Sequence, residues 1–251
     1  MGPLSMRLID QPGTIAYEDE QKTIYLTPQE PLTYYTNKWV YHDMPTFETW
    51  LEDVKTQTHA HLKQESRHLA FTFPENTPLD STFSTYFERE NFDVVLLEMY
   101  AIEAHELAGD IPDGLDIRFV DIYHLDDYLK ICRYFSLDYG KDYADEVVKT
   151  LRQQFDGATN VKRVIAYKDN QPVGTLDMIE SEETIEIDSF GVIKEMRGQG
   201  IGRAMQGFVA NYAKHKPLIL IADGEDTAKE MYIKQGYTFI SYCYSVIKEN
   251  I

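Results

Sequence analysis

A glycine-rich turn in the second half of the chain carries the residues best suited to bind a charged ligand. Gly198, Gly200 and Gly202 stand at alternate positions, with Arg197 before them and Arg203 after them. Glycine leaves the backbone bare and allows positive φ angles. Free N–H groups at the start of a helix attract anions, and the helix dipole strengthens that attraction. The pattern predicts a pyrophosphate group held by main-chain N–H groups.

Two widespread phosphate-binding loops do not fit this turn. The nucleotide P-loop requires Lys followed by Ser or Thr after its last glycine, whereas Ile201 and Gly202 follow Gly200 here. The dinucleotide fingerprint requires Gly or Ala at the position that Arg203 occupies. A glycine-rich turn that precedes a surface helix and binds nothing is a further alternative.

The pattern that fits is Arg-x-x-Gly-x-Gly after a strand that ends at Val192. It resembles the acyl-CoA loop of the GNAT superfamily of N-acyltransferases. A second element, Tyr-x-x-x-Gly-Tyr from Tyr232 to Tyr237, resembles the tyrosine element of that family. The resemblance covers about residues 114–250. It implies acetyl-CoA as co-substrate and a primary amine, on a small molecule or a peptide, as acceptor.

The elements around the turn are expected in the order that the resemblance implies. Apolar alternation and turn residues predict strands, and apolar residues three or four apart predict helices. The predicted strands lie over 161–167, 173–179, 184–192, 217–222 and 237–247, and the predicted helices over 201–213 and 226–235. The fold class that follows is α/β (α+β), with a GNAT-type central mixed, mostly antiparallel sheet flanked by helices.

The first half of the chain predicts a smaller α/β domain. Residues 1–112 contain three of the 14 glycines and no glycine-rich loop. Helices are predicted over 46–62 and 79–91, and strands over 68–74 and 92–101. The order strand, helix, tyrosine, aromatic, strand repeats the order after residue 217, so we interpret this half as a degenerate GNAT-like domain, although helix–strand alternation is common. We expect its boundary with residues 113–251 in a linker over 103–114.

The resemblance assigns the contacts with acetyl-CoA to one stretch of chain. Family members polarise the thioester carbonyl with a main-chain N–H of the strand before the loop, where that strand splays from its neighbour. Gly191 would allow a bulge or a close approach there. The expected contacts are Phe190, Gly191, Val192, Arg197, Gly198, Gln199, Gly200, Ile201, Gly202 and Arg203. Glu225 stands where many members carry Asn, and we expect no contact from it.

Acyl transfer to an amine also needs a proton donor and a base. The resemblance implies Tyr232 as the donor to the leaving thiolate, and the alternative is a tyrosine that only packs. Glu186, six residues before Val192, matches the glutamate base of histone acetyltransferases in the family. Alternation along the strand predicts that Glu186, Asp188 and Phe190 share one face. Two carboxylates there would raise the pKa of one, which suits a base, although both could be ordinary exposed residues.

Composition bounds the class of protein. The formal net charge of −18 at pH 7 repels nucleic acid and anionic membranes, and it either favours a cationic substrate or serves solubility alone. No apolar run approaches the roughly 20 residues of a membrane span, and the N-terminus lacks a secretion signal, so we expect a cytoplasmic protein. Two cysteines make no disulfide framework, and we expect no metal site. A homo-oligomer is compatible with the sequence.

These features predict an N-acetyltransferase in which a bound amine attacks the thioester directly, without an acyl-enzyme. The alternative is a catalytically idle acyl-CoA-binding module whose first half binds a partner protein. An occupied acceptor cleft and a required Tyr232 would favour the enzyme.

Overall fold

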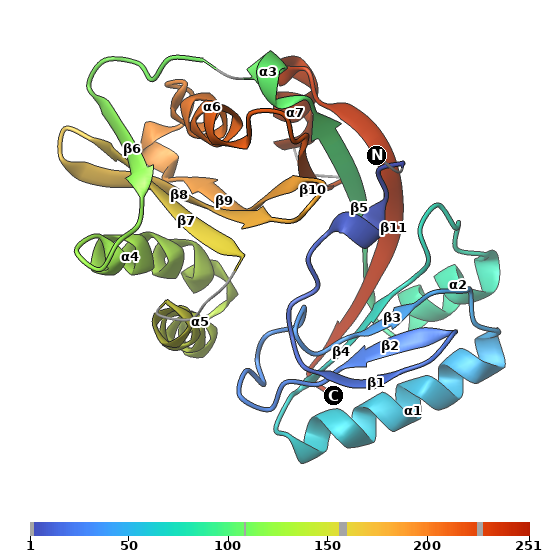
Figure 1. Ribbon diagram of the computed structural model, residues 1–251. Helices are drawn as coiled ribbons and strands as arrows, with labels where there is room; N and C mark the ends of the chain where they lie inside the picture. Colours follow the sequence, from blue (N-terminus) through green and yellow to red (C-terminus); the bar gives the residue numbers. More distant parts are fainter. Residues whose placement is uncertain (1–2, 108, 156–159, 225–227) are drawn as a thin grey trace.

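The computed structural model describes residues 3–107, 109–155, 160–224 and 228–251. The strands in the first half of the chain are β1 (Ile15–Glu18), β2 (Lys22–Tyr25), β3 (Trp39–Tyr41), β4 (His68–Thr72) and β5 (Asp93–Ile102). Those in the second half are β6 (Leu115–Phe119), β7 (Val161–Lys168), β8 (Gln171–Glu180), β9 (Ile185–Val192), β10 (Leu218–Asp223) and β11 (Thr238–Glu249). All of these strands belong to one sheet (Figure 1).

Helices lie on both sides of this sheet (Figure 1). In the first half they are α1 (Phe47–Lys63), α2 (Ser81–Arg89) and the short α3 (Ala104–Leu107). In the second half they are α4 (Leu125–Ser136), α5 (Lys141–Gln154), α6 (Ile201–Ala213) and α7 (Ala228–Gln235). Three short 3₁₀ turns complete the described elements: η1 (Met6–Leu8), η2 (Leu137–Tyr139) and η3 (Lys194–Met196).

The order of the described strands is β1-β2-β3-β4-β11-β5-β10-β9-β8-β7-β6. Neighbours β3 and β4, and neighbours β9 and β10, run parallel, while the other described neighbours are antiparallel. The predicted mixed, mostly antiparallel sheet flanked by helices is therefore confirmed.

The predicted strands and helices of both halves are found close to their expected ends. Thr46 caps α1 as its sequence suggests, because its hydroxyl accepts a hydrogen bond of 3.2 Å from the N–H of Thr49. Of the helix predicted over 226–235, residues 226 and 227 lie outside the described residues. Elements β1, β2, β3, β6, α4 and α5 lie outside the predicted ranges.

One strand of the first half is built into the sheet of the second half. Strand β5 lies between β10 and β11, pairing Ile102 with Leu218 on one side and Ala101 with Thr238 on the other. Strand β11 continues past β5 to pair with β4. Figure 1 shows β5 and β11 as long neighbouring strands that join the two parts of the molecule. The boundary at residue 112 stays a prediction, but the sheet itself is continuous across it.

The two faces of the sheet carry different helices in its second half. On one face, α6 packs over a core that includes Met178 of β8 and Ile187 of β9. On the other face, α4 packs over Ile165 of β7 through Leu125 and Leu129. Figure 1 shows α6 on one side of strands β7, β8 and β9, and α4 and α5 on the other. We call these the α6 face and the α4 face.

Candidate active site

The neighbouring strands β9 and β10 part soon after they begin. They pair at Ile185 with Leu218 and at Glu186 with Ile219, and the described remainder of the two strands is not paired together. Beyond this point β10 continues along β5, and β9 continues along β8. The predicted splaying of the strand before the glycine turn is thus present. It leaves one edge of β9 free to hydrogen-bond an extended ligand.

Strand β9 contains a bulge just before its end. Asp188 is opposite Asp177 of β8, and Gly191 is opposite Thr175, so β9 has one residue more than β8 between these pairs. Ser189 takes up the extra length with a φ of 49°, in the left-handed region. The extra residue of a bulge is left out of the ladder. The bulge therefore frees main-chain polar groups in the part of β9 where the thioester carbonyl was expected to bind.

The bulge overturns one prediction, namely that Phe190 shares a face with Glu186 and Asp188. Phe190 packs instead with the core on the α6 face, where its Cζ lies 3.0 Å from the position of a Cβ atom on Gly202. Glu186 and Asp188 lie on the α4 face, in register with Ile179 and Asp177 of β8. Strict alternation fails because the inserted residue shifts every later side chain to the opposite face.

Gly191 lies on the α4 face beside this bulge. A Cβ atom at this position would lie 2.6 Å from Cε2 and Cζ of Phe135, a residue of α4. A bulge or a close approach was predicted at Gly191. The bulge lies two residues earlier, at Ser189, and the close approach at Gly191 is that of the Phe135 ring.

The glycine turn joins η3 to the start of α6 in the predicted way. Gly198 and Gly200 have φ angles of 74° and 78°, which are strained for residues with a side chain. A Cβ atom on either glycine would meet no atom within 4 Å. Gly200 precedes α6, and no side chain caps the helix. The first N–H groups of α6 have no acceptor within the helix. The turn is therefore open to an anionic group and presents N–H donors to it.

The other residues of the turn differ in their contacts and exposure. Arg197 folds back, and its Nε donates to the carbonyl oxygen of Val192 at 3.0 Å. Gln199 accepts a hydrogen bond of 2.5 Å from the Nζ of Lys168, at the end of β7. Ile201 is buried in the core, so only its main chain faces the turn, whereas the Arg203 side chain is exposed. Arg197 and Gln199 thus hold the turn against the ends of β9 and β7.

Tyr232 lies on α7 and is 7% exposed. Its ring meets the ring of Tyr237 edge-on, with centroids 5.5 Å apart. The hydroxyl of Tyr237 donates to Oε1 of Gln206 in α6 at 2.8 Å. These contacts tie α7 and the start of β11 to α6, the helix that follows the glycine turn. The role of Tyr232 as proton donor stays a prediction.

Glu186 is only 7% exposed, so it is not an ordinary exposed strand residue. Its Oε2 accepts a hydrogen bond of 2.7 Å from the main-chain N–H of Asp10. Burial, with the carboxylates of Asp188 and Asp10, raises the pKa of Glu186 to about 8, against the opposing effects of the Asp10 N–H and the Lys38 ammonium. Such a pKa suits a general base near neutral pH. Asp188 is exposed on the same face.

Residues from the first half, which the sequence did not indicate, surround Glu186. Burial lowers the pKa of Lys38 to about 8, and its charged neighbours include Asp10 and Glu186. The side chain of Tyr35 is half exposed overall, and the partial burial that remains, together with Tyr143 of α5 and Asp188, raises its pKa. No pattern in the sequence links these residues, because the chain brings them to β9 from about 150 positions away or more.

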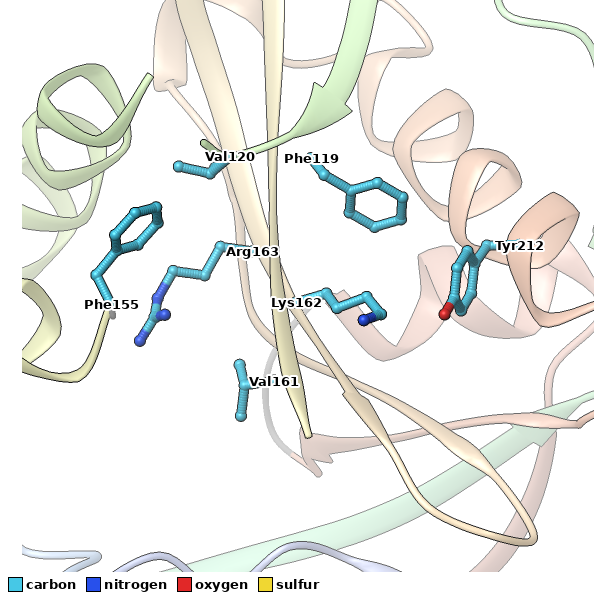
Figure 2. A pocket seen from close by; sticks show the side chains of 7 residues that line it. All are labelled: Phe119, Val120, Phe155, Val161, Lys162, Arg163 and Tyr212. Atoms are coloured by element: carbon cyan, nitrogen blue, oxygen red, sulfur yellow. The ribbon is translucent and has the colours of Figure 1, made fainter. Parts of the chain in front are cut away.

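Among the hollows on the described surface are two of different size, and the larger lies away from Glu186 and its neighbours. It has a volume of about 500 Å³ and is lined by Phe119, Val120, Phe155, Val161, Lys162, Arg163 and Tyr212. Figure 2 shows Phe119, Lys162 and Tyr212 on one side of β7, and Val120, Phe155 and Arg163 on the other. This hollow lies at the start of β7, whereas the glycine turn contacts Lys168 at its end. The smaller, of about 170 Å³, lies in the first half beside Lys22 and Asp53.

In the described part of the chain, no three His, Cys, Asp or Glu side chains are grouped so that they could hold a metal ion. None of the helices there is both long enough and apolar enough to span a membrane.

Both halves of the chain match known families. Residues 128–237 match the acetyltransferase (GNAT) family, and residues 4–100 match a domain of unknown function, DUF5613. No curated protein matches the chain. The GNAT match includes β9, the glycine turn and Tyr232.

Solved structures resemble this chain over most of its length. A functionally unknown conserved protein from Staphylococcus epidermidis ATCC 12228 is 39% identical, with a TM-score of 0.93, over 99% of this chain and 98% of that one. A GCN5-related N-acetyltransferase from Kribbella flavida is 14% identical, with a TM-score of 0.60, over 90% of this chain and 85% of that one. A tandem GNAT protein from the clavulanic acid biosynthesis pathway is 9% identical, with a TM-score of 0.55, over 85% of this chain and 75% of that one. The last two similarities concern the fold alone.

Proposed function

We propose that this chain transfers an acetyl group from acetyl-CoA to a primary amine, because residues 128–237 match the acetyltransferase (GNAT) family. The observation that carries this proposal is the parting of β9 from β10 directly before an open glycine turn. The free edge of β9 suits an extended amide chain, and the turn suits a pyrophosphate. The two features follow each other along one strand, as the two parts of the co-substrate do.

The residues present fit acetyl-CoA, and each has a proposed part. The N–H groups of Gly198, Gly200 and the start of α6 would hold the pyrophosphate, since Cβ atoms are absent where it would approach. Main-chain N–H groups of Phe190 and Gly191, beside the bulge, would polarise the thioester carbonyl. When bound, acetyl-CoA supplies the acetyl group and a thiolate leaving group.

Glu186 is the proposed base and Tyr232 the proposed acid. Glu186, or Asp188 beside it, would take a proton from the amine as the new N–C bond forms. Tyr232 would give its proton to the sulfur as the C–S bond breaks, and solvent would restore it. A buried carboxyl with a pKa of about 8 is a sufficiently strong base for this step.

The two cysteines support direct attack by the amine. Burial raises the pKa of Cys132 to about 12 and that of Cys243 to about 11. Both are therefore thiols at neutral pH, whereas the thiolate is the nucleophilic form. An acyl-enzyme on cysteine is not favoured.

The surroundings of Glu186 support a cationic acceptor. Asp10, Asp188 and Glu186 place three carboxyl groups at the start of the parting strands, against the single ammonium group of Lys38, and Tyr35 and Tyr143 lie nearby. An ammonium ion is attracted to carboxylates and to the faces of aromatic rings. A small-molecule amine and the amino group of a peptide both present this chemistry.

Turnover of acetyl-CoA with a panel of amines tests the proposal. We expect free CoA thiol to appear with at least one amine, and the rate to depend on its concentration. Polyamines, aminoglycosides, amino acids and peptides with free N-termini cover the acceptor classes. Calorimetric binding of acetyl-CoA without turnover on any amine would favour the idle acyl-CoA-binding module instead.

The proposed domain division, residues 1–112 and 113–251, makes a separate prediction. The first half lacks a glycine loop, so we expect one acetyl-CoA per chain by calorimetric titration. Two equivalents per chain would contradict the interpretation of the first half as a degenerate domain.

A further inference from the structure

The segment before β1 reaches across the molecule to the proposed base. Asp10 lies two residues after the end of η1, and its main-chain N–H donates to Oε2 of Glu186, which is 176 positions later in the chain. We infer that this segment, residues 4–10, is a working part of the acceptor site, in which the main chain of Asp10 positions Glu186 and its carboxylate attracts the acceptor amine. This inference rests on the proposed function, since it concerns the proposed base.

Apolar packing fixes the segment before it reaches Glu186. Leu4, Met6, Leu8 and Ile9 pack against a buried cluster formed by β5 and β10, which includes Met99, Ala101 and Ile219. The N–H of Met6 also donates to Oε1 of Glu75 at 3.0 Å. Figure 1 shows the N-terminal part of the chain lying against β5 and β11. The Asp10 N–H is therefore presented by an anchored segment.

The hydrogen bond from Asp10 leaves Glu186 able to accept a proton from the amine. A carboxylate has two oxygens, and the Asp10 N–H donates to Oε2. Oε1 remains available to the amine proton. A short hydrogen bond to a charged acceptor restricts the rotation of the carboxylate, which helps catalysis by fixing the direction of proton transfer.

Asp10 acts on Glu186 in two opposite ways. Its N–H favours the ionised carboxylate, while its own carboxylate repels the charge and raises the pKa of Glu186. Two other charged groups face Glu186: Asp188 on its own strand raises the pKa, and Lys38, just before β3, lowers it. The carboxylate of Asp10 is itself near Asp188 and Lys38. Main chain and side chain of one residue can therefore be tested separately.

Two substitutions at Asp10 separate these effects. Asp10→Pro removes both the N–H and the carboxylate, so its comparison with Asp10→Ala, which removes the carboxylate alone, isolates the N–H. Ile9 already has the extended conformation, φ −75° and ψ 130°, that a following proline requires. Relative to Asp10→Ala, we expect kcat of Asp10→Pro to fall on the order of 10- to 100-fold and the acidic limb of the pH–rate profile to move to higher pH. Asp10→Ala keeps the N–H and removes the charge. We expect its acidic limb to move to lower pH and the KM of the amine to rise severalfold.

An acidic limb at higher pH in Asp10→Pro than in Asp10→Ala identifies a positioning role for the N–H. A merely structural defect would lower the rates of both variants without moving their profiles apart. If Asp10→Pro has the rate and midpoint of Asp10→Ala, the positioning role is wrong. Thermal unfolding shows whether the proline variant is folded.

A spectroscopic measurement decides the contact without proline and without turnover. In the full-length protein, the amide proton resonance of Asp10 should titrate with the ionisation of Glu186, at a pH near 8. This titration should be absent in Glu186→Gln. An amide resonance that follows the same curve in both proteins contradicts the contact. If no amine supports turnover while the amide titrates, the proposed function fails and the contact between the halves stands.

Discussion

Phe135 and Gly191 approach each other more closely than any residue with a side chain at position 191 would allow. Two atoms of the Phe135 ring lie 2.6 Å from the position of a Cβ atom on Gly191. Helix α4 therefore packs directly on the backbone of β9, next to the bulge at Ser189. Helix α4 therefore covers the α4 face of the sheet at the place where the proposed carbonyl-binding N–H groups lie.

Gly191→Ala should force the Phe135 ring away from β9. Overpacking of this kind costs roughly 1–3 kcal/mol, and we expect that loss in the free energy of unfolding measured with urea. The double variant Gly191→Ala with Phe135→Leu should recover part of the loss, because the smaller side chain leaves room for the methyl group. Equal stability of Gly191→Ala and the unaltered protein would show that the ring moves without cost.

Gly200→Val should abolish acetyl-CoA binding while the protein remains folded. The side chain would occupy the open space before α6, and the φ of 78° would be strained. Gly114→Val is a matched control, because Gly114 has the same φ of 78° and equally open surroundings, before β6. Calorimetry should find normal affinity in the control. Unchanged affinity in folded Gly200→Val contradicts the assignment of the turn.

Tyr232→Phe should lower kcat on the order of 10²–10⁴-fold and leave the affinity for acetyl-CoA nearly unchanged. The substitution keeps the ring and its contact with Tyr237 and removes only the hydroxyl. Tyr237→Phe is the control: it loses a hydrogen bond to Gln206 and should cost about 1 kcal/mol of stability without a comparable effect on kcat. An effect of Tyr232→Phe confined to KM would indicate a binding role.

Glu186 should make the stability of the protein fall as the pH rises. Its pKa is about 8 in the folded protein, above the ordinary value of 4.5, so the folded state holds this proton more tightly than the unfolded chain. The contribution is complete below pH 4.5 and is lost as the pH rises through 8. Glu186→Gln removes this dependence. The difference in unfolding free energy between the two proteins should change on the order of 5 kcal/mol across the window.

Urea unfolding of both proteins at several pH values measures this change. If the difference between unaltered protein and Glu186→Gln is constant between pH 4.5 and pH 8, Glu186 does not titrate in this window.

Local patterns determined the elements that carry the cofactor loop. Three patterns carried this information: the glycines at 198, 200 and 202, the apolar period of α6, and the spacing of Tyr232 and Gly236. Within each pattern, the residues are close together in the sequence. Such patterns reflect the backbone conformation and the apolar side of a single helix or strand, and short stretches of chain determine both. The strand order around the turn and the mixed, mostly antiparallel sheet were implied by the resemblance that these patterns carry.

The tertiary structure alone decided what surrounds Glu186. One inserted residue, Ser189, moved Phe190 to the α6 face, and a bulge depends on the partner strand as much as on its own sequence. The chain path brought β5 between β10 and β11 and set the N–H of Asp10 against a carboxylate 176 positions away. Residue spacing carries no information on such contacts, because they depend on how distant segments bury apolar surface together.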